Sequence, residues 1–156
     1  MDLSNTTNMS RYVTFKLADN MAGINILDIR EIVPYIKITP VAKSPEFVLG
    51  LINLRGQILV VFDIGVLLGL EKRTFNKDSH IILFKHKDVG FIVDRIGDVI
   101  TMDKEVSDDI PANIDSGIKE YMEKIINFSG DILVILDAGK ILSKTLSGQP
   151  SAQGEL

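Results

Sequence analysis

A segment of nine residues occurs twice in this chain, and the duplication limits the possible folds more than any other feature. The first copy covers residues 52–60 and the second covers residues 126–134, which lie 74 positions later. Asp63, which follows the first copy, recurs at the same offset as Asp137. A repeat with so long a period predicts a duplicated β unit rather than a solenoid, whose repeats are shorter.

An earlier pair of segments also matches. Residues 23–33 resemble residues 90–100, at an offset of 67 positions. Because the offset grows between the two pairs of segments, the second copy must contain a longer middle loop. The acidic, turn-rich residues 103–116 are the expected place for that loop.

Within the first copy, the apolar run 58–62 follows an Arg55-Gly56 corner and stops at Asp63. The run is short, β-branched and bounded by turn residues, which is typical of a strand that is covered on both faces. Asp63 is well placed to cap a short helical turn over residues 64–68, and Gly69 can end that turn.

The length of 156 residues corresponds to about one domain, and 46% hydrophobic residues are sufficient for a core. Each repeat alone would be a marginal domain, so we expect the two units to pack together over shared apolar surface. The net charge of −4, the 6% aromatic content and the absence of Trp argue against a nucleic-acid-binding protein. There is no Cys, which excludes disulfides and thiolate metal sites.

The ends of the chain differ from its middle. Residues 1–10 are polar, lack a signal-peptide core and are predicted to be disordered, and residues 147–156 are predicted to form a flexible tail. No apolar stretch approaches the roughly 20 residues that cross a bilayer. We therefore expect a soluble, cytoplasmic domain over residues 11–146, with two interleaved subdomains whose motifs lie near 11–70 and 79–146.

Alternation of apolar and polar residues over 12–17 predicts a half-buried strand that a hairpin turn at 18–20 follows. Ser44 and Pro45 predict the start of a helix, and Gly97-Asp98 predicts a bulge between strands. Asp137 is expected to cap a final helix over 138–146. The other expected strands cover residues 24–26, 29–38, 58–62, 81–84, 91–93, 99–102, 121–128 and 132–136, and 81–102 are assigned to the second unit.

No catalytic or metal-binding pattern is evident in the sequence. His80 and His86 lie at the two ends of one expected strand, roughly 20 Å apart at about 3.3 Å per residue, so they cannot share a metal ion. The acidic residues of the 103–116 loop lack the spacing and central glycine of a calcium-binding hand, and a solvated loop is the favoured interpretation. We therefore expect no enzyme activity, metal or cofactor.

Glu31 and Arg55 are charged residues within otherwise apolar segments. In one interpretation they are solvated surface groups, worth less than about 1 kcal/mol to stability. In the other, Arg55 is held on a stiff corner by Gly56 and borders a binding groove, where a planar guanidinium favours recognition. Ser129 stands at the equivalent place in the second copy, so the fold does not require the charge.

Two long segments carry a resemblance to a known family. Residues 38–41 and 44–58 resemble the signature of CheW-type chemotaxis coupling proteins, and residues 90–99 resemble the second motif of that family. The match spans roughly residues 10–146. It implies a mostly β fold of two SH3-like five-stranded barrels on a shared hydrophobic interface, with short helices that include one near the C-terminus.

The resemblance also implies a function without catalysis. Proteins of this family bridge the cytoplasmic tips of chemoreceptors to the regulatory domain of the CheA histidine kinase, and the receptor tip is expected in a groove between the barrels. The alternatives are a small β-barrel that binds nucleic acid, which the acidity disfavours, and an enzyme of unknown type. The chain departs from the family pattern at Val60, where Pro is usual, and at Gly65, where Arg is frequent.

Site residues follow from the resemblance, position by position. The positions expected to bind the receptor are Ile29, Glu31, Arg55, Ile81, Ile82 and Val99, and those expected to bind the kinase are Val41 and Gly50. Val60 restores a backbone donor, so its strand is expected to pair where a proline would not. Gly65 removes a cation, which places in doubt any contact that depends on charge there.

Overall fold

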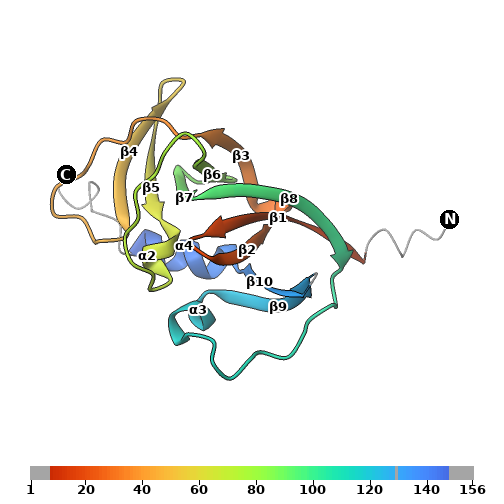
Figure 1. Cartoon of the computed structure of the whole chain (residues 1–156). Helices are drawn as coiled ribbons and strands as arrows, with labels where there is room; N and C mark the ends of the chain where they lie inside the picture. The colour runs from red at the N-terminus through yellow and green to blue at the C-terminus, as the bar shows by residue number, and fades with distance from the viewer. Residues whose placement is uncertain (1–7, 129, 148–156) are drawn as a thin grey trace.

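The computed structural model describes residues 8–128 and 130–147. Within these ranges, the first half of the chain forms β1 (Met9–Leu17), β2 (Asn20–Asn25), the 3-10 turn η1 (Ile26–Asp28), β3 (Ile29–Pro34), β4 (Val48–Leu54), β5 (Gln57–Asp63) and α2 (Ile64–Leu67). The second half forms β6 (His80–Phe84), β7 (Val89–Val93), β8 (Arg95–Asp103), α3 (Ser116–Glu120), β9 (Met122–Phe128), β10 (Asp131–Leu136) and α4 (Ala138–Ser147). The mostly β fold that the sequence predicts is therefore confirmed (Figure 1).

The strands form two five-stranded sheets with the same internal order. Sheet A has the order β8-β1-β2-β10-β9, and sheet B has the order β3-β6-β7-β5-β4. Exchanging β1–β5 for β6–β10 converts one order into the other, so the duplication is present in the topology as well as in the sequence. Among the described residues, strand pairing ends at β8 and β9 in sheet A and at β3 and β4 in sheet B, so the pairing does not close either sheet into a barrel.

The register of the strands repeats the sequence offsets. In sheet A, the parallel pair β2–β10 places Ala22 opposite Val134. In sheet B, the parallel pair β7–β5 places Val89 opposite Val60. These partners are related by the same offsets of 67 and 74 positions that relate the two copies in the sequence, so the internal repeat is confirmed residue by residue.

The chain changes sheet once within each repeat. β1 and β2 belong to sheet A, whereas β3–β7 form sheet B and β8–β10 return to sheet A. The prediction that residues 81–84 and 91–93 share a unit with 99–102 is therefore wrong, because β6 and β7 pair within sheet B and β8 pairs with β1. The two crossings occur directly before β3 and between β7 and β8.

The core has one shared region and two smaller regions. The shared region lies between the sheets and includes Phe15 of sheet A, whose ring centroid is 5.6 Å from that of Phe91 in sheet B. Phe62 and Phe84 extend this aromatic cluster. Each sheet also has an apolar cluster of its own: Leu59 and six other buried residues in sheet B, and Leu133 with four others in sheet A. The expected shared hydrophobic interface is therefore present.

Several local predictions need correction. β1 is buried on both faces over residues 12–15 rather than half-buried, because Tyr12 and Thr14 are buried as well as Val13 and Phe15, whereas Lys16 is exposed as expected. β1 begins at Met9, so residues 9 and 10 of the expected disordered tail lie in a strand, whereas residues 1–7 and 148–156 lie outside the described part of the chain. Ser44 starts no helix: its hydroxyl donates to the carbonyl of Val41 at 2.9 Å.

Other local predictions are confirmed. The turn at 18–20 joins β1 and β2 with Leu17 opposite Asn20. The bulge at Gly97-Asp98 appears as a register shift in β8, where both residues face Thr14. Asp63 caps α2 by accepting hydrogen bonds from the backbone N–H groups of Gly65 and Val66. The short helix α3, which Asp115 caps, was not predicted.

Candidate functional site

The corner between β4 and β5 is a two-residue turn made by Arg55 and Gly56. Both residues have positive φ angles, 52° and 86°, as in the type I′ turns that match the twist of a hairpin. The side chain of Asn53 accepts a hydrogen bond from the N–H of Gly56 at 3.0 Å. A left-handed conformation is unfavourable for a residue with a Cβ, so it is the pairing of β4 with β5 that imposes it on Arg55 and defines where its side chain starts.

Arg55 forms an ion pair with Glu31, which lies on β3. Its Nη2 atom is 2.5 Å from Oε1 of Glu31, and the two side chains are 67% and 32% exposed. Beside it, Nη2 of Arg30 donates to the side-chain oxygen of Gln57 at 3.3 Å. Since β3 and β4 are the two edge strands of sheet B, these contacts show that the sheet curls until its edges approach at this corner. An exposed pair of this kind contributes little to stability, about 0–1 kcal/mol.

The structure separates the other residues that were expected to bind the receptor. Ile81 and Ile82 on β6 have 0% of their surface exposed, so as contact residues they are corrected: their side chains fill the core. Ile29, at the start of β3, is also buried. Val99 is 50% exposed, but it lies on β8 of sheet A. Glu31, Arg55 and Val99 are therefore the members of this set that present surface to a partner.

The two residues expected to bind the kinase, Gly50 and Val41, both lie near Thr39. Gly50 has a φ of +149°, and a Cβ placed on it would be 2.0 Å from the carbonyl oxygen of Thr39. Only glycine fits, because Thr39 pairs with Leu51 across this position. Gly50 is buried and supports the backbone rather than offering a contact, whereas Val41, two residues beyond Thr39, is partly exposed.

Val60 uses the backbone donor that a proline would lack. Its N–H donates to the carbonyl of Asp88 at 3.0 Å, and this bond begins the parallel pairing of β5 with β7. The expectation that this strand pairs through Val60 is confirmed.

A cation lies beside Gly65 although the glycine has no charge of its own. A Cβ placed on Gly65 would lie only 2.3 Å from Nη1 of Arg73, so the guanidinium of Arg73 occupies the space above this glycine. Arg73 donates from Nε and Nη2 to the carboxylate of Asp94, with a shortest distance of 2.8 Å. Its Nη2 atom is also 3.6 Å from the carboxylate of Asp63. A cation from a residue eight positions further on therefore lies beside Gly65.

Asp63 is the most buried acid of this network, with 2% of its side chain exposed. Burial raises the pKa of its carboxyl above the ordinary value, because the charged form loses water. The nearby guanidinium of Arg73 and the N–H groups of Val66 and Gly65 oppose this pKa shift. Arg73 therefore helps to keep a buried carboxylate ionised at the junction of the sheets.

The two histidines lie where the sequence places them, at the ends of β6. The ring of His80 contacts the carbonyl of Asp78 at 3.1 Å, and His86 is exposed in the following turn. Among the residues that the structure describes, no group of three metal-ligating side chains comes together, and no helix has the length and apolar character to cross a membrane.

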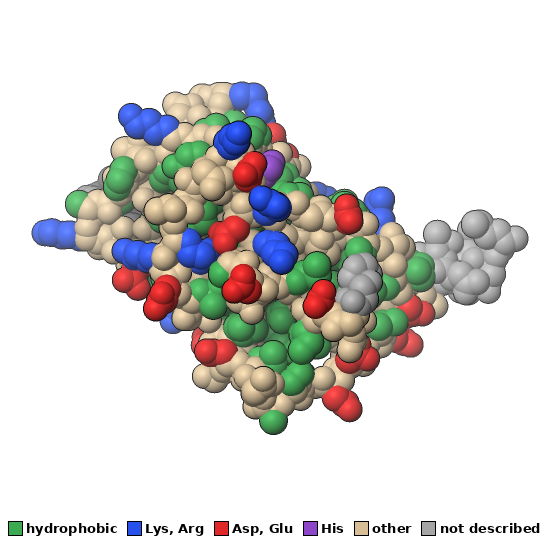
Figure 2. Space-filling view, in the orientation of Figure 1, with side chains coloured by type: hydrophobic (Ala, Val, Ile, Leu, Met, Phe, Trp, Pro, Cys, Tyr) green, Lys and Arg blue, Asp and Glu red, His purple; other side chains and the backbone are tan. Residues whose placement is uncertain are grey.

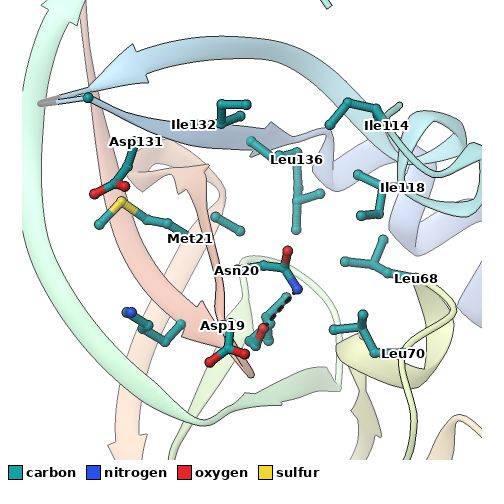
Figure 3. A pocket seen from close by; sticks show the side chains of 15 residues that line it. Asp19, Asn20, Met21, Leu68, Leu70, Ile114, Ile118, Asp131, Ile132 and Leu136 are labelled. Atoms are coloured by element: carbon teal, nitrogen blue, oxygen red, sulfur yellow. Dashed lines mark hydrogen bonds between the residues drawn. The ribbon is translucent and has the colours of Figure 1, made fainter. Parts of the chain in front are cut away.

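An apolar groove opens between sheet A and the end of α2. Figure 2 shows hydrophobic side chains gathered in this region, below the centre of the view, with acidic side chains near its margin. In Figure 3, Ile114, Ile118, Leu68 and Leu70 lie in a row along one side of the groove, and Ile132 lies further along it. Its volume is about 440 Å³. Its lining residues include Lys16, Leu17, Asp19, Asn20, Met21, Ala22, Asp131, Val134 and Leu136.

Sequence reasoning anticipated a groove between the two units but none of the residues that line this one. Its walls come from the segment that begins at Leu68 after α2, the β1–β2 turn, β10, and α3 with the residues before it, which the chain crossings bring together. The available signal in the sequence was Ile132, an apolar residue just after a turn. Its equivalent in the first copy is Ile58. Both isoleucines are exposed.

Comparison with known proteins agrees with this architecture. A family model described as "CheW-like domain" matches residues 11–146. The chemotaxis protein CheW of Klebsiella aerogenes is 28% identical over 143 residues, which cover 90% of this chain and 86% of that protein. The chemotaxis protein CheW of Helicobacter pylori is 30% identical over 124 residues, with 74% and 75% covered. The crystal structure of the scaffolding protein TtCheW from Thermoanaerobacter tengcongensis matches with a TM-score of 0.72 and 34% identity, covering 82% of this chain and 88% of that one.

The fold and the corner site together define an internally duplicated β module of two like sheets, with an exposed charge pair at one corner and an apolar groove elsewhere. Within that class, the chain belongs to the CheW-like domain family.

Proposed function

We propose that this chain is a non-catalytic coupling protein of chemotaxis, which bridges the cytoplasmic tips of chemoreceptors to the regulatory domain of the CheA histidine kinase. The observation that carries the proposal is the Glu31–Arg55 pair. The fold holds Arg55 in a strained turn at an exposed corner, although the equivalent corner of the second copy has Ser129 in the sequence. A charge that the fold does not need, on a rigid support, suits recognition of a partner.

In this proposal, Glu31, Arg55 and Val99 contact the receptor, and Val41 lies on the side that contacts the kinase. Each sheet combines strands from both copies of the repeat, in equivalent order, so one molecule carries two related but unlike surfaces. Head-to-tail contacts between unlike surfaces are heterologous, and they close into rings when the rotation permits. A kinase domain of the same double-barrel architecture would fit such an arrangement.

The proposed action is mechanical rather than chemical. The receptor would bias the kinase through the geometry of the contacts, and this chain would perform no reaction. Interfaces of modest area are weak in isolation, and linkage of many copies in a receptor array supplies avidity. The proposed location is the cytoplasm, beside membrane-anchored receptors.

A binding assay tests the proposal directly. The purified chain is presented to a receptor tip fragment, to the CheA regulatory domain and to single-stranded nucleic acid in parallel. We expect capture of the first two and not of the third. Capture of nucleic acid alone would replace the coupling function with the alternative of a nucleic-acid-binding β module.

A further inference from the structure

Two of the walls of the apolar groove belong to different parts of the chain. One wall is the β1–β2 turn, which contributes Leu17 and Asp19. The other consists of Leu68 at the end of α2 and Leu70 in segment 69–79, which leads to β6. The first wall is part of sheet A and the second follows sheet B, so the spacing between the walls depends on what joins the two sheets at this place.

The carboxylate of Asp94 joins them. Asp94 lies between β7 and β8, where the chain crosses from sheet B to sheet A. On the side of sheet A, its Oδ2 atom accepts a hydrogen bond from the N–H of Ala18 at 2.7 Å, and its own N–H donates to the carbonyl of Lys16 at 3.1 Å. Ala18 is the residue between Leu17 and Asp19, so Asp94 holds the first wall directly.

On the other side, the same carboxylate is held by Arg73. Two nitrogens of the guanidinium, Nε and Nη2, reach Asp94 at 2.8–3.0 Å. Arg73 is fixed in its own segment, because Nη1 donates to the carbonyl of Glu71 at 3.3 Å and the guanidinium lies over the ring of Phe75. A forked pair of this kind defines orientation as well as distance. Its arginine is only 15% exposed, so solvent screens it less than a surface pair.

We propose that the Arg73–Asp94 ion pair is a clasp that sets the spacing between these two walls of the apolar groove. Arg73 lies three residues beyond Leu70, and the N–H of Leu70 donates to the carbonyl of Gly65. Only a short stretch of chain therefore connects the groove residue Leu70 to the clasp. Arg73 and Asp94 are positioning residues, because neither side chain lines the groove. The inference goes beyond the proposed function and does not depend on what occupies the groove.

A distance measurement tests the clasp. The chain has no Cys, so a pair of introduced cysteines carries two spin labels without competition. Asp19→Cys and Glu71→Cys place the labels on exposed positions on either side of the clasp. In the Arg73→Ala variant, we expect the distance distribution of this pair to become broader than in the wild type and its mean to increase, because the two segments are no longer held together.

Matched variants and labels complete the design. Asp94→Asn should produce the same shift as Arg73→Ala, and Arg73→Lys, which keeps the charge but not the fork, should produce a smaller one. Lys37→Cys with Lys87→Cys, both exposed and outside the clasp, should report no change. If Arg73→Ala does not fold, Arg73→Lys and Gly65→Ala, which displaces the guanidinium, provide the test.

An unchanged distribution for positions 19 and 71 in a folded variant would overturn the clasp. Equal broadening for both label pairs would also overturn it, because the network would then act only on general stability. These measurements contain no receptor or kinase, so their failure would leave the proposed function intact.

Discussion

The guanidinium of Arg73 occupies the space that a side chain at Gly65 would need. A Cβ at Gly65 would meet Nη1 of Arg73 at 2.3 Å, Nη2 at 2.8 Å and Cζ at 2.9 Å. The ion-pair network of Arg73 and Asp94 therefore depends on a glycine at this position, because the absence of a side chain leaves room for the guanidinium. Two positions that are eight residues apart in the sequence act as one unit.

This relationship predicts that substitutions at the two positions are not additive. Gly65→Ala should destabilise the wild-type protein by about 1–3 kcal/mol, because the new methyl group displaces a packed guanidinium. In an Arg73→Ala background, the same change should stay within about 0.5 kcal/mol, because the space is then empty. Urea unfolding of the four proteins measures the coupling. Equal costs in both backgrounds would show that the two residues do not share the site.

The raised pKa of Asp63 makes the stability of the protein depend on pH, and the pKa itself should depend on Arg73. A carboxyl whose folded pKa lies above its unfolded value binds more protons when folded, so its favourable contribution is present below about pH 3.8 and is lost as the pH rises through the folded pKa. Burial causes the rise and Arg73 opposes it, so Arg73→Ala should raise the pKa of Asp63 further.

A titration of the Asp63 carboxyl carbon by NMR measures this directly. The wild type should titrate below the Arg73→Ala variant, and Arg73→Lys, which retains a positive charge, should lie between them. Identical titration curves in the wild type and in Arg73→Ala would mean that the guanidinium does not act on this acid.

Neighbouring residues on β5 provide a test of the core. Leu59 is 0% exposed and Ile58 is 54% exposed, although they are adjacent. Leu59→Ala should cost about 2–5 kcal/mol through a cavity in the cluster of sheet B. Ile58→Ala should change the free energy of unfolding by less than about 0.5 kcal/mol, as an exposed substitution does. Similar losses for both would contradict the burial of this strand as described.

Gly50 and Gly56 have positive φ angles but different surroundings. Gly50→Ala should cost about 3 kcal/mol or more, because the backbone of Thr39 lies where the methyl group would be. Gly56→Ala should cost about 1–2 kcal/mol, since nothing lies within 4 Å of its added carbon and only the left-handed conformation is unfavourable. Thermal unfolding followed by circular dichroism compares the two, and a cost for Gly56 that equals that of Gly50 would refute the steric argument.

The sequence predicted the units of the fold better than their assembly. The repeat of residues 52–60 identified both hairpins, and the same offsets govern the strand register, because duplicated segments that keep their apolar pattern keep their pairing. Two interleaved subdomains were expected, but the positions of the crossings between sheets, at Asp28 and Asp94, were not predicted, because the local apolar pattern of a strand is the same whichever sheet receives it. Ile81 and Ile82 are core residues because β6 lies inside sheet B, between β3 and β7.

The candidate site was predicted in part. Arg55 was found because a charge stood in an apolar segment beside a turn, and its pairing with Glu31 depends on the curl of sheet B, which no local pattern encodes. Arg73 stood in a charged linker and carried no signal of its own. Its role became visible only when the fold placed Gly65, Asp63 and Asp94 around it.

The central claim is that the Glu31–Arg55 corner recognises a partner and is not needed for folding. The most direct measurement is the affinity of a chemoreceptor tip fragment for the wild type, Arg55→Glu and the swapped variant Glu31→Arg/Arg55→Glu, with Lys119→Glu on α3 as a control of equal charge change. We expect the melting temperatures to stay close to that of the wild type, Arg55→Glu and the swapped variant both to lose binding, and Lys119→Glu to bind normally. Normal binding by Arg55→Glu, or recovery of binding in the swapped variant, would contradict this claim, because the pair would then serve only the structure of this chain.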